Sequence, residues 1–188
     1  MQFLSTGKLV ALLGAVGALP LVACHDLTAR QVEDISTAQN NWAADTGVVS
    51  TFLSNAVTFS GADLVAQAQN ALDHENDELK HKAALDAVFL NVANPNSLVV
   101  QANNVLVNQG TFESVVSNLQ NFVTFGADFD AEEIAGLVGD INNVRCAQVL
   151  PAIDQYFQAV GDVLQNGIDV LAVRPTNCPS GTKKRSEL

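Results

Sequence analysis

The sequence predicts an all-α fold, a single-domain bundle of five or six helices. Apolar residues between Val32 and Leu171 recur at three- and four-residue spacings, and no stretch alternates convincingly over the length of a strand. Turn-forming residues at Asn94-Pro95-Asn96, Gly110 and Gly126 interrupt this pattern. Hydrophobic residues make up 48% of the chain and charged residues only 15%, which excludes a disordered protein.

Two long helices are expected before the break at Asn94-Pro95-Asn96. The first is expected over 32–57, where Trp42 and Phe52 belong to one apolar face. Ser60-Gly61-Ala62-Asp63 resembles a capping box, with Asp in place of Glu, and starts a second helix that runs to about residue 90.

Four further helices follow the break. A short one is expected over 97–108, and Thr111 is expected to cap the next, over 111–125. The residues Asp-Ala-Glu-Glu form a capping box that opens a helix over 130–144. The last helix is predicted over 147–171, with a proline in its first turn or at a kink.

The N-terminal segment predicts export from the cell. Lys8 precedes an apolar run over 9–22 that suits a signal peptide and is too short to span a bilayer. Small residues allow cleavage after residue 18, which makes 1–18 the signal peptide, or alternatively after residue 23, which makes it 1–23. No second apolar run occurs, so we expect a secreted, extracellular protein without a membrane span, either free or associated with the cell wall.

Three cysteines in an exported protein leave one unpaired. Cys146 and Cys178 are the natural pair, and their disulfide would pin a tail over 173–188 onto the bundle domain, 31–172. Cys24 has two explanations. It is either the acylated first residue of a bacterial lipoprotein, or part of a eukaryotic pro-segment over 19–30 that is removed.

The tail also carries a processing signal. Lys183-Lys184-Arg185 is a tribasic run at which a proprotein convertase would cut, in keeping with the eukaryotic explanation and a second cut after Arg30. A frayed, solvated terminus is the alternative interpretation of this run.

Charge and motifs exclude several function classes. The formal net charge of −11 repels phosphate backbones, so we expect no nucleic-acid partner. No nucleophile elbow, zinc-protease motif or glycine-rich phosphate loop occurs, so we expect no enzyme activity and no cofactor.

His74, Glu78 and His81 form a candidate metal set. Their i, i+4, i+7 spacing places them within about 60° of one another on one helix face. Two imidazoles and a carboxylate are a plausible set for Zn²⁺ or Fe²⁺. The alternative is a solvated flank beside the apolar stripe.

Glu75, Lys82 and Asp86 project into the centre of the same helix's apolar stripe. Buried charges cost several kcal/mol unless they are paired. Lys82 lies four residues from both Glu78 and Asp86 and is expected to pair with either. One interpretation is an internal polar network, and the other is a polar anchor for a ligand.

Several segments resemble small secreted proteins of filamentous fungi. They are Gly17-Ala18-Leu19-Pro20, the segment up to Arg30, Asp34-Ile35-Ser36-Thr37, Glu75-Asn76-Asp77-Glu78-Leu79 and His81-Lys82. The chain is also distantly similar to the hydrophobic surface-binding and cell-wall galactomannoprotein families. This resemblance implies an extracellular helical bundle that binds lipid or coats apolar surfaces, and it implies no catalytic residue.

The expected function is therefore binding of a hydrophobic ligand, such as a fatty acid or other lipid, or of an apolar surface outside the cell. One alternative is an extracellular metal-binding bundle that uses His74, Glu78 and His81. Another is a secreted, effector-like interaction protein. The sequence leaves the ligand, the partner and the oligomeric state open.

Overall fold

The computed structural model describes residues 23–165 and 169–179. The predicted signal peptide over 1–18 and the tribasic sequence Lys183-Lys184-Arg185 lie outside the described residues. None of the helices in the described part of the chain is long and apolar enough to cross a membrane.

The predicted all-α, single-domain bundle is confirmed, because the regular elements of the described residues are helices. Six are α-helices: α1 (Ala23–Asn55), α2 (Gly61–Phe89), α3 (Ser97–Asn103), α4 (Thr111–Phe125), α5 (Ala131–Val144) and α6 (Leu150–Leu164). Short 3₁₀ turns, η1 (Ala56–Thr58) and η3 (Gly126–Asp128), follow α1 and α4. Two π-helical turns, η2 (Asn104–Asn108) and η4 (Arg145–Val149), extend α3 and join α5 to α6.

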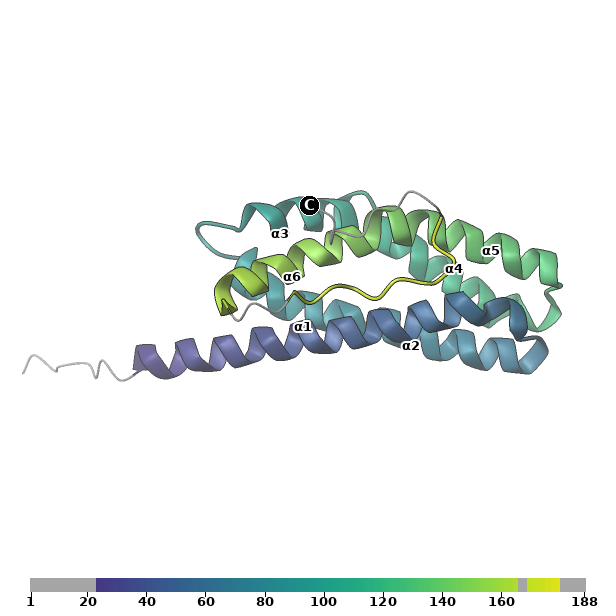
Figure 1. The fold of residues 1–188 in the computed structure, drawn as a ribbon, viewed down its shortest axis with the longest axis horizontal. Coiled ribbons are helices and arrows are strands. Elements are labelled where there is room, and N and C mark those ends of the chain that lie inside the picture. The colour runs from purple at the N-terminus through teal and green to yellow at the C-terminus, as the bar shows by residue number, and fades with distance from the viewer. Residues whose placement is uncertain (1–22, 166–168, 180–188) are drawn as a thin grey trace, which may run out of the picture.

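The helices form an elongated bundle built on two long layers. In Figure 1, α1 and α2 run antiparallel along one side, and α5, η4 and α6 follow one another end to end on the other. α2 also packs on α4, while α6 packs on both α3 and α1. The π turn inside the α5–α6 rod shifts its helical register by one residue, a feature frequently found at functional positions.

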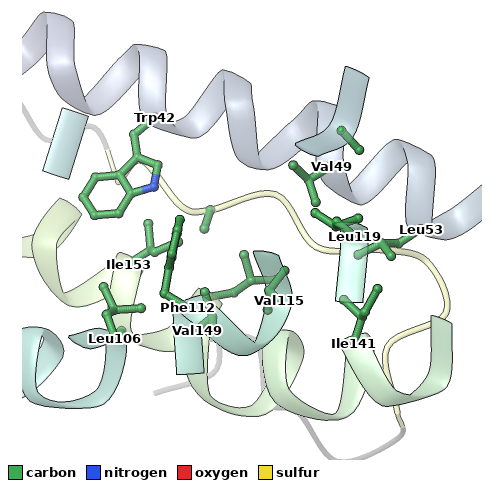
Figure 2. Close-up of a cluster of buried hydrophobic side chains, with 14 of the residues drawn as sticks. Trp42, Val49, Leu53, Leu106, Phe112, Val115, Leu119, Ile141, Val149 and Ile153 are labelled. Carbon is green, nitrogen blue, oxygen red and sulfur yellow. The ribbon is translucent and has the colours of Figure 1, made fainter. Parts of the chain in front are cut away.

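The core lies between these layers and is rich in large apolar side chains. Figure 2 shows residues of α1 facing residues of the other helices; those labelled are Trp42, Val49, Leu53, Leu106, Phe112, Val115, Leu119, Ile141, Val149 and Ile153. Each such side chain contributes about 1.5–3 kcal/mol when fully buried. Packing of these amphipathic faces, rather than helix propensity, supplies most of the stability.

The three helix starts expected at residues 60, 111 and 130 agree with the structure, but only one of the three expected capping interactions is formed. The capping box of Asp130 and Glu133 is confirmed, with both reciprocal hydrogen bonds present. Ser60 occupies the predicted N-cap position of α2, but its side chain makes no capping hydrogen bond, so the expected capping box is not formed. The cap at Thr111 is also wrong: Gly110, at φ 68°, takes the N-cap position, and the Thr111 hydroxyl donates to the Val105 carbonyl instead.

The last predicted helix, over 147–171, is wrong at both ends. A π turn replaces its beginning, and α6 ends at Leu164, where Gln165 enters the left-handed region at φ 48°. Pro151 lies in the first turn of α6, where its missing N–H is least costly. Residues 169–179 form no helix, and we call them the C-terminal strap.

The C-terminal strap is attached to α1 and to the α5–α6 rod. The Val173 N–H donates to Thr46 Oγ1 at 3.0 Å, and the Ser50 hydroxyl donates to the Val173 carbonyl at 2.7 Å. The predicted disulfide between Cys146 and Cys178 is present. In Figure 1 the strap runs between α1 and α6, so it covers the junction of the two layers.

Candidate metal centre

Helix α2 carries polar residues on two different faces. His74, Asp77 and His81 lie on the side that meets α1, and Glu75, Glu78 and Lys82 are buried toward the core. The structure therefore brings His74 and His81 together and separates Glu78 from them.

Asp45 of α1 is the residue on which the two histidines converge. Its Oδ1 atom lies 2.7 Å from His74 Nδ1, and its Oδ2 atom lies 3.1 Å from His81 Nε2. Asp77 Oδ2 lies 4.0 Å from the same His81 nitrogen. One donor atom from each of Asp45, Asp77 and His81 lies within 4.8 Å of the others. We call these three residues the seam cluster.

The spacing of the seam cluster suits a small metal ion. Metal–ligand bonds of about 2.1 Å in a tetrahedral site place neighbouring donor atoms about 3.4 Å apart. Asp45 is only 7% exposed, and its Oδ2 atom makes no hydrogen bond to any described residue. A buried carboxylate oxygen without a hydrogen bond is costly, and a cation beside it, either the protonated ring of His81 or a bound metal ion, would satisfy it.

Asp77 is held in its ionised form by a neighbour. Lys80 pairs with its Oδ1 atom, and this hydrogen bond lowers the pKa of Asp77 below its ordinary value. The other oxygen, Oδ2, faces His81. Because metal ligands must be deprotonated, the pairing with Lys80 leaves a carboxylate oxygen ready for a cation.

The core face of α2 carries a second polar group, which we call the buried triad: Glu75, Glu78 and Arg145. All three side chains are fully buried. Arg145 Nη2 lies 3.2 Å from Glu78 Oε1 and 3.4 Å from Glu75 Oε2. The indole N–H of Trp42 donates to the other oxygen of Glu78 at 2.7 Å. One guanidinium therefore serves two carboxyl groups.

Burial governs the protonation of the triad. Loss of water raises the pKa of Glu75, against the opposing charge of Arg145. Burial, together with the charge of Glu75, raises the pKa of Glu78 well above its ordinary value. With two carboxyls and one cation in a dry site, retaining a proton on the pair avoids an unbalanced buried charge.

The triad predicts a specific pH dependence of stability. A carboxyl whose pKa is higher in the folded than in the unfolded protein binds more protons when folded. The stabilisation that Glu78 contributes is therefore fully present below its pKa in the unfolded protein, near 4.5. It is lost as the pH rises through the higher pKa of Glu78 in the folded protein. Glu78→Gln should remove much of this loss and be at least as stable as the wild type at pH 7, because Glu75 alone then pairs with Arg145.

Urea unfolding from pH 4 to pH 8 measures this effect as the difference between variant and wild type. Glu132→Gln is the matched control, because Glu132 is exposed in the first turn of α5. If the free energy of unfolding of Glu78→Gln depends on pH as that of the wild type does, Glu78 has the same pKa in the folded and unfolded states.

Lys82 and Asp86 form a separate network one to two turns further along α2. Lys82 Nζ donates to Asp86 Oδ2 at 2.6 Å and to Asn103 Oδ1 at 2.7 Å. The Tyr156 hydroxyl donates to Asp86 Oδ1 at 2.7 Å. Of the two partners expected for Lys82, the structure pairs it with Asp86. The residues Glu75, Lys82 and Asp86, expected to form either an internal polar network or a ligand anchor, belong to two internal networks.

A groove is lined by residues of α1 and α2, together with Val173 of the C-terminal strap. Its volume is about 390 Å³, and it opens to solvent rather than lying inside the bundle. The surface inside it is mostly apolar, with a few hydroxyl and amide groups. Residues that line it include Ala44, Val48, Phe52, Phe59, Gln67 and Asn70.

Three residues of these sites were not singled out from the sequence: Asp45, Asp77 and Arg145. The available signal for Asp45 was its place three residues after Trp42, at the border of the apolar stripe. Arg145 offered a clearer signal, as a lone basic residue beside a cysteine at the end of an apolar helix. Neither signal identifies its partner, because the partners are on another helix.

No protein-family model, curated protein or solved structure matches this chain. The functional argument therefore rests on the chemistry of the residues.

Proposed function

We propose that the protein is a secreted, non-enzymatic helical bundle that binds one divalent transition-metal ion between α1 and α2. The observation that carries this proposal is the buried Oδ2 atom of Asp45, which accepts no hydrogen bond from the residues that the structure describes and lies 3.1 Å from His81 Nε2. Asp77 supplies the third donor. Secretion is supported by the apolar N-terminal segment.

The donor set selects the class of metal. Two carboxylate oxygens and one imidazole nitrogen suit Zn²⁺, Mn²⁺ or Fe²⁺. Mg²⁺ prefers oxygen donors and retains its waters, and Ca²⁺ takes six or more oxygens, so both fit this set poorly. An imidazole donor therefore favours a transition metal over the abundant alkaline-earth ions.

His74 has a supporting role in this site. Its ring nitrogen lies 2.7 Å from Asp45 Oδ1 and so fixes the direction of the carboxylate. Partners of this kind orient a metal ligand, and their loss typically weakens affinity by about 10–100-fold. His74 thus belongs to the site as a positioning residue.

Titration calorimetry of the apo protein with Zn²⁺ at neutral pH tests the proposal. We expect one ion per chain, and Zn²⁺ at 100 times its Kd should raise the free energy of unfolding by about 2.7 kcal/mol. Asp45→Asn and His81→Ala should abolish binding. His74→Ala should weaken it by about 10–100-fold.

Asp140→Asn is the matched control, because it removes one exposed carboxylate of α5 and should leave the Zn²⁺ affinity unchanged. Glu78→Gln separates this site from the metal set expected on one helix face, since Glu78 faces the core and its loss should retain binding. If Zn²⁺ produces no binding heat and no thermal stabilisation, the seam cluster is a hydrogen-bonded group of polar side chains on the flank of α2 and not a metal site.

Binding of an apolar molecule is a second candidate function. The α1–α2 groove favours it, because its volume lies within the range of about 300–1,000 Å³ for small-molecule sites. Displacement of a fluorescent apolar probe by added lipid tests this function. Failure of every lipid to displace the probe would count against it.

A further inference from the structure

The groove and the seam cluster are neighbours along the same pair of helices. Ala44 lines the groove and is adjacent to Asp45, which belongs to the seam cluster. On α2, Asn70 lines the groove. Because residues four apart share a helix face, the end of the groove at Asn70 lies about one helical turn from His74, the residue that contacts Asp45.

A metal ion in the seam cluster would have room for another donor. Three protein ligands leave at least one position of a tetrahedral ion open, and five-coordinate geometry opens a second. Asp77, His74 and His81 are all partly exposed to solvent, so the open position faces outward rather than into the core.

Charge determines which external donor binds. The chain carries a formal net charge of −11, and two of its carboxylates, Asp45 and Asp77, belong to the seam cluster near the end of the groove at Asn70. Without a cation, this end of the groove repels an anion. A divalent ion cancels both carboxylate charges locally, so binding of an anion becomes dependent on the metal.

We propose that the metal-loaded protein binds an organic carboxylate, whose oxygen completes the coordination of the metal and whose apolar chain lies in the α1–α2 groove. This inference rests on the proposed metal site and adds its ligand. The groove supplies apolar contacts from Val48, Phe52 and Phe59, and the amides of Gln67 and Asn70 line its polar side. A neutral alcohol with the same chain is a weaker donor without charge, so it gains little from the metal.

Titration with octanoate and with octanol, each with apo and Zn²⁺-loaded protein, tests the proposal. Octanoate should bind the Zn²⁺-loaded protein at least about tenfold more tightly than the apo protein. Octanol should bind both forms alike. Equal affinity of octanoate for the two forms would overturn the proposal.

Two variants locate the octanoate. Val48→Asn places an amide in the groove and should weaken octanoate binding by about tenfold while Zn²⁺ affinity stays unchanged. Val163→Asn, at an exposed valine of α6, is the matched control and should change neither. Octanoate binding that is untouched by Val48→Asn would place the chain elsewhere and overturn the groove assignment.

The same titrations separate the two proposals. Zn²⁺ binding without Zn²⁺-dependent octanoate binding would overturn the carboxylate ligand and leave the metal site intact. Absence of Zn²⁺ binding by the wild type would overturn both.

Discussion

Replacing Arg145 with methionine should lower the free energy of unfolding by about 3–5 kcal/mol at pH 7. The guanidinium is fully buried and is the cation that faces both Glu75 and Glu78. Its removal leaves two buried carboxyls with no opposing charge, and both must then be protonated or hydrated inside the core. Urea unfolding followed by circular dichroism measures the loss.

The matched control is Lys80→Met, which also removes one positive charge from an ion pair. Lys80 is largely exposed, so its replacement should change the free energy of unfolding far less than Arg145→Met does. A further variant, Arg145→Met with Glu75→Leu and Glu78→Gln, should recover much of the loss, because no unpaired charge remains and Trp42 keeps an acceptor. A small effect in Arg145→Met would show that water reaches the triad.

Removing the disulfide, in the variant Cys146→Ala with Cys178→Ala, should cost about 3–4 kcal/mol in the chain-entropy model. The two cysteines are 32 residues apart, so the bridge closes a loop that includes α6 and the C-terminal strap. Thermal unfolding compared with the wild type measures the loss.

A reducing agent provides the control for this variant. It should lower the stability of the wild type to that of the double variant and leave the double variant itself unchanged. If the strap keeps its hydrogen bonds to Ser50 and Thr46 after reduction, the loss arises mainly from the unfolded state, as the model assumes. A loss below about 1 kcal/mol would contradict the expected contribution of the loop.

Local patterns were sufficient for most of the fold. The spacing of apolar residues depends only on the 3.6-residue turn, so the all-α class and the positions of α2 and α4 could be predicted without knowing which helices touch. The capping box at Asp130 and Glu133 is equally local and was confirmed. The predicted cap at Thr111 was wrong because Gly110 takes the N-cap position in a left-handed conformation. Residue preferences for capping positions do not predict that backbone conformation.

The end of the chain shows a different limit. The apolar residues after Leu164 continue the helical spacing, yet Gln165 ends α6 and residues 169–179 lie against α1. Hydrogen bonds from α1 and the disulfide at Cys178 hold this strap, and these are contacts with residues far away in the sequence. The cysteine count was enough to predict the bridge, but not the extended backbone that the bridge holds.

The sequence by itself determined the fold class, the disulfide and the fact that α2 carries unusual charges. Only the tertiary structure decided how those charges divide. The register between α1 and α2 puts Asp45 against His74 and His81, and the π turn at the α5–α6 junction brings Arg145 to Glu75 and Glu78. Helical spacing is a local property of one segment, whereas an ion pair or a metal site needs donors from two segments. Their meeting depends on how the helices pack.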